Sequence, residues 1–199
     1  MILDLIIGPM FSGKTSKLIQ IHKECERNNQ KTLVINHHSD TRYHPTKLSN
    51  HDLEMIDCHQ TGTLRSILLG DTHTGTTSPL LRGVDVLLIN EGQFYPDLFE
   101  TIRSLVMTAP STSIPSTSIP SVQLSRIVIS GLDGDFKQEK IGQIIDLIPY
   151  ANSVEKLRAN CGNCLGHNIA IFSKRLSSEK EQIVVGTSNY IPVCRSCLL

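Results

Sequence analysis

The sequence predicts an α/β fold in which helices flank a parallel sheet. Four short apolar runs stand out, and each is nearly continuous rather than alternating, which is typical of strands buried on both faces of a parallel sheet. An amphipathic stretch over residues 12–28 joins the first two runs, and residues 99–107 form a second helical stretch before the last run. The order of strand, helix and strand indicates βαβ units. The four runs are residues 2–7, 32–35, 84–89 and 126–129.

Length and charge limit the classes of function. The chain has 199 residues and can bury about 70% of its unfolded surface without disulfide support. Its 19 basic residues balance 19 acidic ones, which argues against a protein that mainly binds nucleic acid or an anionic membrane. No apolar stretch approaches the roughly 18–20 residues of a membrane helix, and the apolar N-terminal run lacks the basic region and cleavage site of a signal peptide. We therefore expect a cytoplasmic protein that binds neither nucleic acid nor membrane.

The chain is expected to divide after Pro149 into two domains. Residues 1–150 carry the predicted strands and helices, whereas residues 151–199 are more polar, contain paired cysteines and include a hairpin-like stretch. Two segments of the first domain resemble insertions: residues 70–79 are rich in Thr, Gly and Ser, and residues 109–121 repeat Pro-Ser-Thr-Ser-Ile. Such compositions cannot supply a core face, so both segments are predicted to be flexible loops.

The first apolar run is followed by a match to the phosphate-binding pattern G-x-x-x-x-G-K-[ST] at every fixed position. The glycines allow a tight turn that aims backbone N–H groups at phosphate oxygens, and the next helix adds the positive end of its dipole. Lys14 is expected to reach the β and γ phosphates and Thr15 to hold Mg²⁺. The sequence therefore predicts a nucleoside triphosphate site. It is formed by Gly8, Pro9, Met10, Phe11, Ser12, Gly13, Lys14 and Thr15.

The third apolar run is followed by Asn90 and Glu91. Proteins with this phosphate motif need an acidic residue near the end of a neighbouring strand, to hold Mg²⁺ or to activate the nucleophile. Asn90 stands where a metal-positioning Asp is expected. A carboxylate beside the γ phosphate can accept a proton from an attacking hydroxyl, so Glu91 is the predicted general base.

Four of the six cysteines form two Cys-x-x-Cys pairs, Cys161 with Cys164 and Cys194 with Cys197. Together they would complete a four-cysteine site for structural Zn²⁺ that keeps no open position for chemistry. A redox-active pair or unrelated core cysteines remain alternatives. Cys25 and Cys58 are predicted to be small buried residues. The eight histidines lack acidic or cysteine partners at ligand spacing and are expected at the surface or in loops.

Taken in order along the chain, these motifs resemble those of the thymidine kinases of the cellular, zinc-containing type, which also occur in bacteria and poxviruses. The resemblance covers nearly the whole chain. It implies a kinase that uses ATP and Mg²⁺ to phosphorylate thymidine, a small C-terminal zinc ribbon that carries a lasso loop, and a homotetramer. Besides the phosphate motif and the cysteine pairs, it is carried by Asp-Thr-Arg-Tyr at 40–43, Glu-Gly-Gln-Phe at 91–94 and Gly-Leu-Asp-Gly-Asp-Phe at 131–136.

The resemblance also implies roles for individual residues. Glu91 would take the proton of the 5′-hydroxyl, while Lys14, Arg42 and Mg²⁺ would stabilise the transferred group. Zinc would anchor both ends of the lasso loop, which would recognise the base through main-chain groups. The ATP site would comprise Gly8 to Thr15 with Asp40, Thr41, Arg42, Asn90 and Gln93. The thymidine site would comprise Met10, Leu132, Phe136 and Tyr190 with the loop residues Ser173, Gln182, Ile183, Val184, Val185 and Gly186.

Two residues depart from the family pattern. Asn90 replaces the usual Asp, which would weaken Mg²⁺ binding or slow the reaction, because an amide carries no charge. Ile141 stands where an aromatic residue is common, which would loosen the base pocket. An active enzyme is still expected, and the change Asn90→Asp is expected to leave its activity unchanged or to raise it.

Two other functions remain open at this point. The first is an NTPase that uses its zinc ribbon to hold nucleic acid; such a ribbon should be rich in Lys and Arg, and residues 162–172 contain neither. The second is an inactive relative, disabled by Asn90, that binds nucleotide without turnover.

Overall fold

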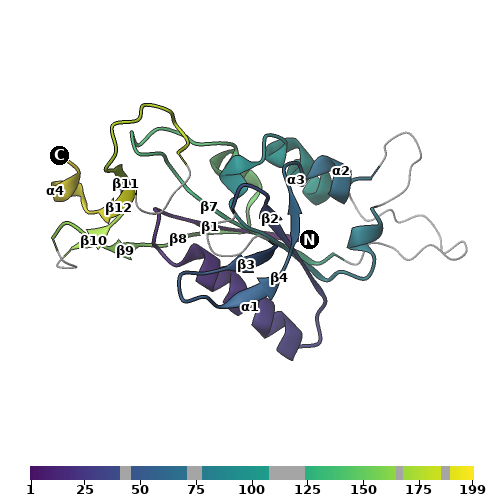
Figure 1. Ribbon diagram of the computed structural model, residues 1–199. Coiled ribbons are helices and arrows are strands. Elements are labelled where there is room, and N and C mark those ends of the chain that lie inside the picture. Colours follow the sequence, from purple (N-terminus) through teal and green to yellow (C-terminus); the bar gives the residue numbers. More distant parts are fainter. Residues whose placement is uncertain (41–45, 71–77, 108–123, 165–167, 185–188) are drawn as a thin grey trace, which may run out of the picture.

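A computed structural model describes residues 1–40, 46–70, 78–107, 124–164, 168–184 and 189–199. A six-stranded sheet with the order β5-β2-β6-β7-β1-β8 lies at its centre (Figure 1), and every neighbouring pair of strands is parallel. The predicted parallel sheet is therefore confirmed. Its strands are β1 (Ile2–Ile7), β2 (Thr32–His37), β5 (His59–Thr61), β6 (Val86–Ile89), β7 (Arg126–Gly131) and β8 (Ser153–Lys156).

Helices cover both faces of this sheet (Figure 1). On one face, Val86 and Leu88 of β6 belong to the same buried cluster as Leu18 of α1 (Lys14–Arg27). On the other face, Leu87 of β6 shares a cluster with Ile102 of α3 (Leu98–Met107). That second cluster also includes residues of α2 (Arg65–Leu68) and of the 3-10 helix η3 (Ile144–Tyr150). Because successive side chains of a strand point to opposite faces, burial on both sides explains why the apolar runs are continuous.

The strand β8 begins three residues after the boundary expected at residue 150. It pairs with β1 over Asp4 to Ile7, so the large sheet extends at least to Lys156. All four residues of β8 are exposed, because the strand lies at an edge of the sheet. The polar sequence Ser-Val-Glu-Lys gave no apolar signal. The division into two domains stays a prediction.

A short hairpin lies beside α1. It consists of β3 (Lys47–Ser49) and β4 (Met55–Asp57), which pair in antiparallel fashion. The side-chain amide of Asn50 donates a hydrogen bond to the Ser16 hydroxyl over 3.1 Å. Residues 71–77 and 109–121 of the two predicted loops lie outside the described residues. Pro79 begins the 3-10 helix η1 (Pro79–Leu81), and η2 (Gly92–Phe94) follows β6.

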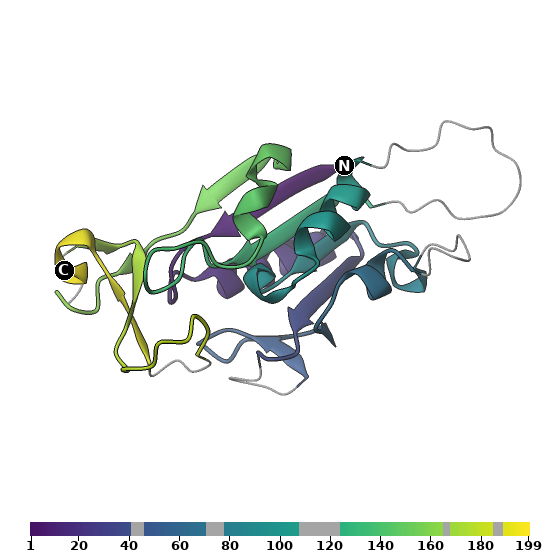
Figure 2. The ribbon, with the colours of Figure 1, turned by 90° about the horizontal axis from the view of Figure 1, so that it is seen from above.

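The C-terminal part contains two antiparallel ribbons and a short helix, at one end of the molecule (Figure 2). Its buried core is small and includes Ala170 and Val193 beside two of the paired cysteines. Nowhere in the described residues is a helix long and apolar enough to cross a membrane. The elements of this part are β9 (Ala159–Asn160), β10 (Ile169–Ala170), β11 (Phe172–Arg175), β12 (Tyr190–Val193) and α4 (Arg195–Leu198).

Candidate functional site

The predicted phosphate motif forms the turn between β1 and α1. Gly8 and Gly13 have φ angles of +149° and +81°, which L side chains rarely adopt. A Cβ atom on Gly8 would also lie 2.5 Å from the carbonyl oxygen of Leu157, so this position accepts only glycine. Phe11 has a positive φ of 63°. The turn therefore has the tight shape that brings successive backbone N–H groups to bear on a phosphate.

The start of α1 suits an anion. Among the described residues, no side chain caps the helix at Gly13, and the first turn holds no acidic residue. Its N–H groups and the positive end of its dipole therefore point toward the turn. Lys14 Nζ and Ser12 Oγ both donate hydrogen bonds to the carbonyl oxygen of Pro9, over 2.7 and 2.8 Å. The ammonium group of Lys14 is thus held beside the backbone of the phosphate motif, at Pro9.

Two buried carboxylates, those of Asp40 and Glu91, lie beyond the carboxyl ends of β2 and β6. Glu91 has φ 53° and ψ 44°, a left-handed conformation that is costly for a non-glycine residue and common at functional sites. Gln93 Nε2 donates to Glu91 Oε2 over 2.5 Å, while Gln93 Oε1 accepts from the Leu132 N–H over 2.9 Å. Because the Leu132 N–H can only donate, it fixes which end of the Gln93 amide faces Glu91.

Asn90 is 1% exposed and is hydrogen-bonded within the protein. Its Oδ1 atom accepts from Ser130 Oγ over 2.8 Å, and its Nδ2 atom donates to Asn36 Oδ1 over 3.0 Å. Asn36 in turn donates to Asp40 Oδ2 over 3.3 Å. Asn90 is therefore connected to Asp40 through Asn36.

One cavity joins the phosphate motif, both carboxylates and the C-terminal part of the chain. Gly8, Pro9 and Asn90 are not among the described residues that line it. Thr41, Arg42, Val185 and Gly186 lie outside the described residues. All other residues expected in the two binding sites line this cavity: Met10, Phe11, Ser12, Gly13, Lys14, Thr15, Asp40, Glu91, Gln93, Leu132, Phe136, Ser173, Gln182, Ile183, Val184 and Tyr190.

Hydrogen bonds tie the distant parts of this cavity wall together. The Met10 N–H donates to Ser173 Oγ over 2.9 Å, which connects the phosphate motif to β11. Gln182 Nε2 donates to Asp135 Oδ2 over 2.8 Å and to the Lys140 carbonyl over 3.1 Å. Apolar and aromatic walls with a few converging polar groups are typical of a site for a small molecule.

Part of the cavity wall consists of residues that no sequence motif marks. His51, in the turn between β3 and β4, lies with its ring centroid 5.0 Å from that of Phe11. No motif marks this turn, which contacts α1 through the hydrogen bond from Asn50 and the phosphate motif through the ring of His51. The buried Ile141, which was not expected in either binding site by number, also lines the cavity. The further lining residues are Ser16, Ser39, Ser49, Asn50, Phe94, Gly134 and Asp135.

The expectation that the histidines lie at the surface or in loops is wrong for His37. This residue ends β2, is buried, and stacks on His38 with a centroid distance of 4.5 Å. Its ring also lies 5.0 Å from that of Tyr95, edge to face. Burial lowers the pKa of His37, and the neighbouring His38 lowers it further. His37 is buried because it ends a buried strand. The spacing between possible metal ligands, on which the expectation rested, carries no information on burial.

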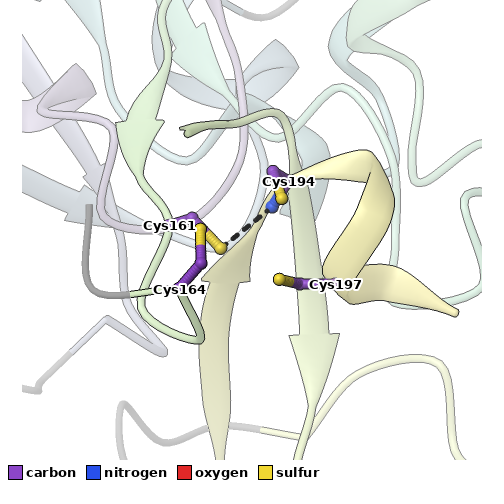
Figure 3. A group of neighbouring side chains, drawn as sticks. All are labelled: Cys161, Cys164, Cys194 and Cys197. Carbon is purple, nitrogen blue, oxygen red and sulfur yellow. Dashed lines mark hydrogen bonds between the residues drawn. The ribbon is translucent and has the colours of Figure 1, made fainter. Parts of the chain in front are cut away.

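The four paired cysteines lie together (Figure 3), and their sulfur atoms are all within 4.8 Å of one another. Cys161 and Cys164 follow β9, while Cys194 and Cys197 lie at the start and within α4. All six cysteines are in the described part of the chain, and none forms a disulfide. Four thiols at this spacing fit tetrahedral Zn²⁺, for which Zn–S distances are about 2.3 Å. The cluster can therefore bind zinc.

Hydrogen bonds to sulfur favour the thiolate form that zinc requires. The Cys194 N–H donates to Cys161 Sγ over 3.3 Å (Figure 3). Burial alone would raise the pKa of Cys161, but backbone N–H groups, including that of Cys194, outweigh it and lower the pKa to about 6. Within the cluster the Asn163 side chain lowers the pKa of Cys197, but the contacts with Cys194 and Cys161 and burial outweigh it and raise the pKa to about 11. Outside the cluster, burial raises the pKa of Cys25, and that of Cys58 to about 11. Cys25 is buried as predicted, whereas Cys58 is only half-buried.

Comparison with known proteins agrees with the order of the motifs. The model of the family described as "Thymidine kinase" matches residues 1–198. The cytosolic thymidine kinase of Homo sapiens is 32% identical over 196 residues, which are 98% of this chain and 72% of that protein. The thymidine kinase of fowlpox virus (strain NVSL) is 33% identical over 199 residues, which are 98% of this chain and 95% of that protein. The chain therefore belongs to the thymidine kinase family of enzymes.

Proposed function

We propose that the protein transfers the γ-phosphoryl group of ATP to the 5′-hydroxyl of thymidine, which yields thymidine monophosphate for DNA synthesis. One observation carries this proposal: the phosphate motif, Glu91 and a set of flat apolar side chains line the same cavity. A phosphate donor and a nucleoside acceptor can therefore be held in contact there, and such positioning supplies much of the rate of phosphoryl transfer. The names of the relatives support thymidine as the acceptor.

The phosphate motif binds the donor in this proposal. The backbone of residues 8–13 and the start of α1 surround the phosphates, and Lys14 exchanges its hydrogen bond to Pro9 for one to a phosphate oxygen. The Thr15 hydroxyl and the Asp40 carboxylate are suited to hold Mg²⁺, since both are oxygen ligands on the cavity wall. Mg²⁺, when bound, neutralises phosphate charge. We also assign Thr41, Arg42 and Gln93 to this part of the site, with Asn90 behind it.

Glu91 acts as the general base. The Gln93 amide orients its carboxylate, so that it accepts the proton of the 5′-hydroxyl while the new O–P bond forms. The bond between the γ phosphorus and the oxygen of the β phosphate breaks in the same step, and ADP leaves. The left-handed backbone at Glu91 ends the extended course that the chain follows in β6, so the side chain of Glu91 does not continue the alternation of that strand. No covalent intermediate is required, because the nucleoside hydroxyl attacks the γ phosphate directly.

The apolar wall binds the base. Met10, Leu132, Phe136 and Tyr190 cover it, and main-chain groups of residues 182–186, together with Ser173, distinguish thymine from other bases. A structural Zn²⁺ held by Cys161, Cys164, Cys194 and Cys197 anchors the chain on either side of this loop. Zinc bound by these four sulfur atoms would keep no open position, so it would take no part in the chemical step.

We further propose that the enzyme is a cytoplasmic homotetramer. Light scattering of the purified protein with and without ATP tests the assembly. A particle of four chains is expected, and a stable monomer would contradict it.

A turnover assay tests the function. Purified protein with Mg-ATP is offered each of the four deoxynucleosides and deoxyuridine, beside the variants Glu91→Gln and Glu100→Gln. Thymidine monophosphate should form with the unchanged protein and the Glu100 control, since Glu100 lies on α3 away from the cavity wall, and be lost with Glu91→Gln. ATP binding without any product would favour an inactive relative, and salt-sensitive binding of single-stranded DNA would favour the nucleic-acid function.

A further inference from the structure

Arg175, the last residue of β11, is a buried cation whose hydrogen-bond donors are all used. A guanidinium has five N–H groups. Two bonds run to the Tyr190 hydroxyl, from Nε over 3.2 Å and from Nη2 over 2.5 Å. The other three run to the carbonyl oxygens of Glu179, Glu181 and Gln182, over 3.0, 2.5 and 3.0 Å. Such complete use of a planar donor group indicates a built contact rather than a solvated surface charge.

The same guanidinium stacks on an aromatic ring of the cavity wall. Its Cζ atom lies 3.7 Å from the ring centroid of Phe136 and 5.1 Å from that of Tyr190. Both rings line the cavity, whereas Arg175 is absent from its described wall. Arg175 therefore lies behind two side chains that are assigned to the base.

Alternation along β11 separates this contact from the cysteine cluster. Ser173 and Arg175 are buried and face the cavity side: Ser173 lines the cavity itself. Lys174, between them, points the other way and donates to the carbonyl oxygens of Cys197 and Leu198, over 3.1 and 3.2 Å. Two neighbouring basic residues thus hold backbone carbonyls on opposite sides of one strand.

We propose that Arg175 is a positioning residue for the nucleoside: it fixes the segment 179–184 and the rings of Phe136 and Tyr190 in the arrangement that accepts the base. The segment it holds continues directly into Gln182, Ile183 and Val184 on the cavity wall. Gln182 is held a second time by its bond to Asp135. Zinc anchors the ends of the loop, and Arg175 sets the course of the chain between them. This inference rests on the function proposed above.

Lysine cannot replace arginine here. An ammonium group has three donors and no plane, so it cannot reach three carbonyls and a hydroxyl while it lies flat on Phe136. The variant Arg175→Lys keeps the positive charge and removes the planar group of five N–H donors. It should leave the segment 179–184 poorly fixed while β11 and β12 stay paired.

The test compares Arg175→Lys with Lys174→Met, which also loses bonds to two carbonyls on the same strand. Arg175→Lys should raise the KM for thymidine about tenfold or more and change the KM for ATP less than about twofold, with zinc content unchanged. Tyr190→Phe should raise the KM for thymidine by a smaller factor. Adding it to Arg175→Lys should have little further effect, because both changes disrupt the same hydrogen-bond network.

Lys174→Met is the matched control and should leave both KM values near those of the unchanged enzyme. An unchanged KM for thymidine in Arg175→Lys, an equal rise in Lys174→Met, or loss of zinc from Arg175→Lys would each overturn the proposal.

A second measurement does not depend on turnover. A protease that cleaves after glutamate can attack the chain at Glu179 and Glu181. Cleavage there should be slow in the unchanged protein and at least about tenfold faster in Arg175→Lys, because fixing of this backbone limits access. Equal cleavage rates would overturn the role of Arg175 even in an active enzyme. Faster cleavage in a protein without thymidine kinase activity would instead reject the proposed function and keep the structural role.

Discussion

The side-chain amide of Asn90 donates a hydrogen bond to Asn36 Oδ1, 3.0 Å away, and the amide of Asn36 donates one to Asp40. The amide of Asn90 is thus matched by a partner that accepts from its N–H group. Asn90 also accepts from Ser130, so both ends of its amide are engaged. This arrangement explains how an amide is accommodated at a site where an acid was expected. It also determines the effect that an acid at position 90 should have on stability.

The variant Asn90→Asp should be less stable than the unchanged protein. An aspartate cannot donate to Asn36, so either two oxygens face each other or Asn36 turns and loses its bond to Asp40. Leaving one buried polar group unsatisfied costs about 1–3 kcal/mol. Urea unfolding should show a loss of this size at pH 7.

The activity of Asn90→Asp, measured at a temperature where it remains folded, is still expected to equal or exceed that of the unchanged enzyme. The variant Ser130→Ala is the control, because it removes the other bond of Asn90 and adds no charge. Equal stability of Asn90→Asp and the unchanged protein would show that Asn36 adapts without cost. A large loss of activity would show that Asn90 is more than a neutral substitute for Asp.

Replacing Gln93 by Glu should shift the pH dependence of the reaction. The change would place a second carboxylate about where the Gln93 amide now donates to Glu91, 2.5 Å away. Two acids so close share a proton, so the base stays protonated to higher pH. The acidic limb of the profile of kcat/KM should therefore move up by about one pH unit or more, with the lost rate partly recovered in alkaline buffer. Gln93→Met should lower the rate without this recovery; a profile for Gln93→Glu that keeps its position would contradict the assigned contact.

Removal of zinc should affect the nucleoside more than the donor. The cysteine cluster is joined to the apolar wall through β11 and β12, whereas the phosphate motif is the turn between β1 and α1 and contacts β11 through the Met10 N–H. A chelator, or the variant Cys164→Ser, should therefore lower the melting temperature and raise the KM for thymidine at least about tenfold, with a smaller change for ATP. Cys58→Ser is the matched control outside the cluster. Equal changes in the two KM values would argue against a separate role for this part of the chain.

His37 should make the protein less stable at acidic pH. Burial lowers its pKa below the ordinary value of 6.5, so the unfolded chain takes up this proton before the folded one does. The free energy of unfolding should therefore fall as the pH drops from 6.5 to the lower pKa of the folded state. His37→Gln should flatten this part of the plot of unfolding free energy against pH. The matched variant His59→Gln, at an exposed histidine, should leave the slope of that plot unchanged. Thermal melting between pH 7.5 and 5 measures both.

The sequence predicted those parts of the fold that depend on local patterns. The strands β1, β2, β6 and β7 are continuous apolar runs because both faces of the sheet are covered, and the phosphate motif is a chain of adjacent residues. The edge strand β8 gives no apolar signal because its side chains are exposed. Its pairing with β1 and the hydrogen bond from Ser153 Oγ to Asp4 Oδ1 join residues far apart in the sequence, which no local pattern reveals.

Contacts between distant residues set the limit of prediction at the site. Gln93 was expected near ATP, but nothing local reveals its bonds to Glu91 and Leu132. Arg175 gave no signal at all, since three of its partners are carbonyl groups that every residue possesses. The spacing of the cysteines did indicate a cluster, because metal ligands occur in pairs of fixed separation.

The close approach of Gly8 to Leu157 has a consequence for the order in which the protein can fold during synthesis. In the described sheet β1 lies between β7 and β8, and both are translated more than a hundred residues after it. Until they leave the ribosome, an apolar segment has no sheet to join and must be kept from premature association. Pairing across such a separation is also slow. The phosphate motif, which directly follows β1, should thus be among the last parts of the molecule to take its final shape.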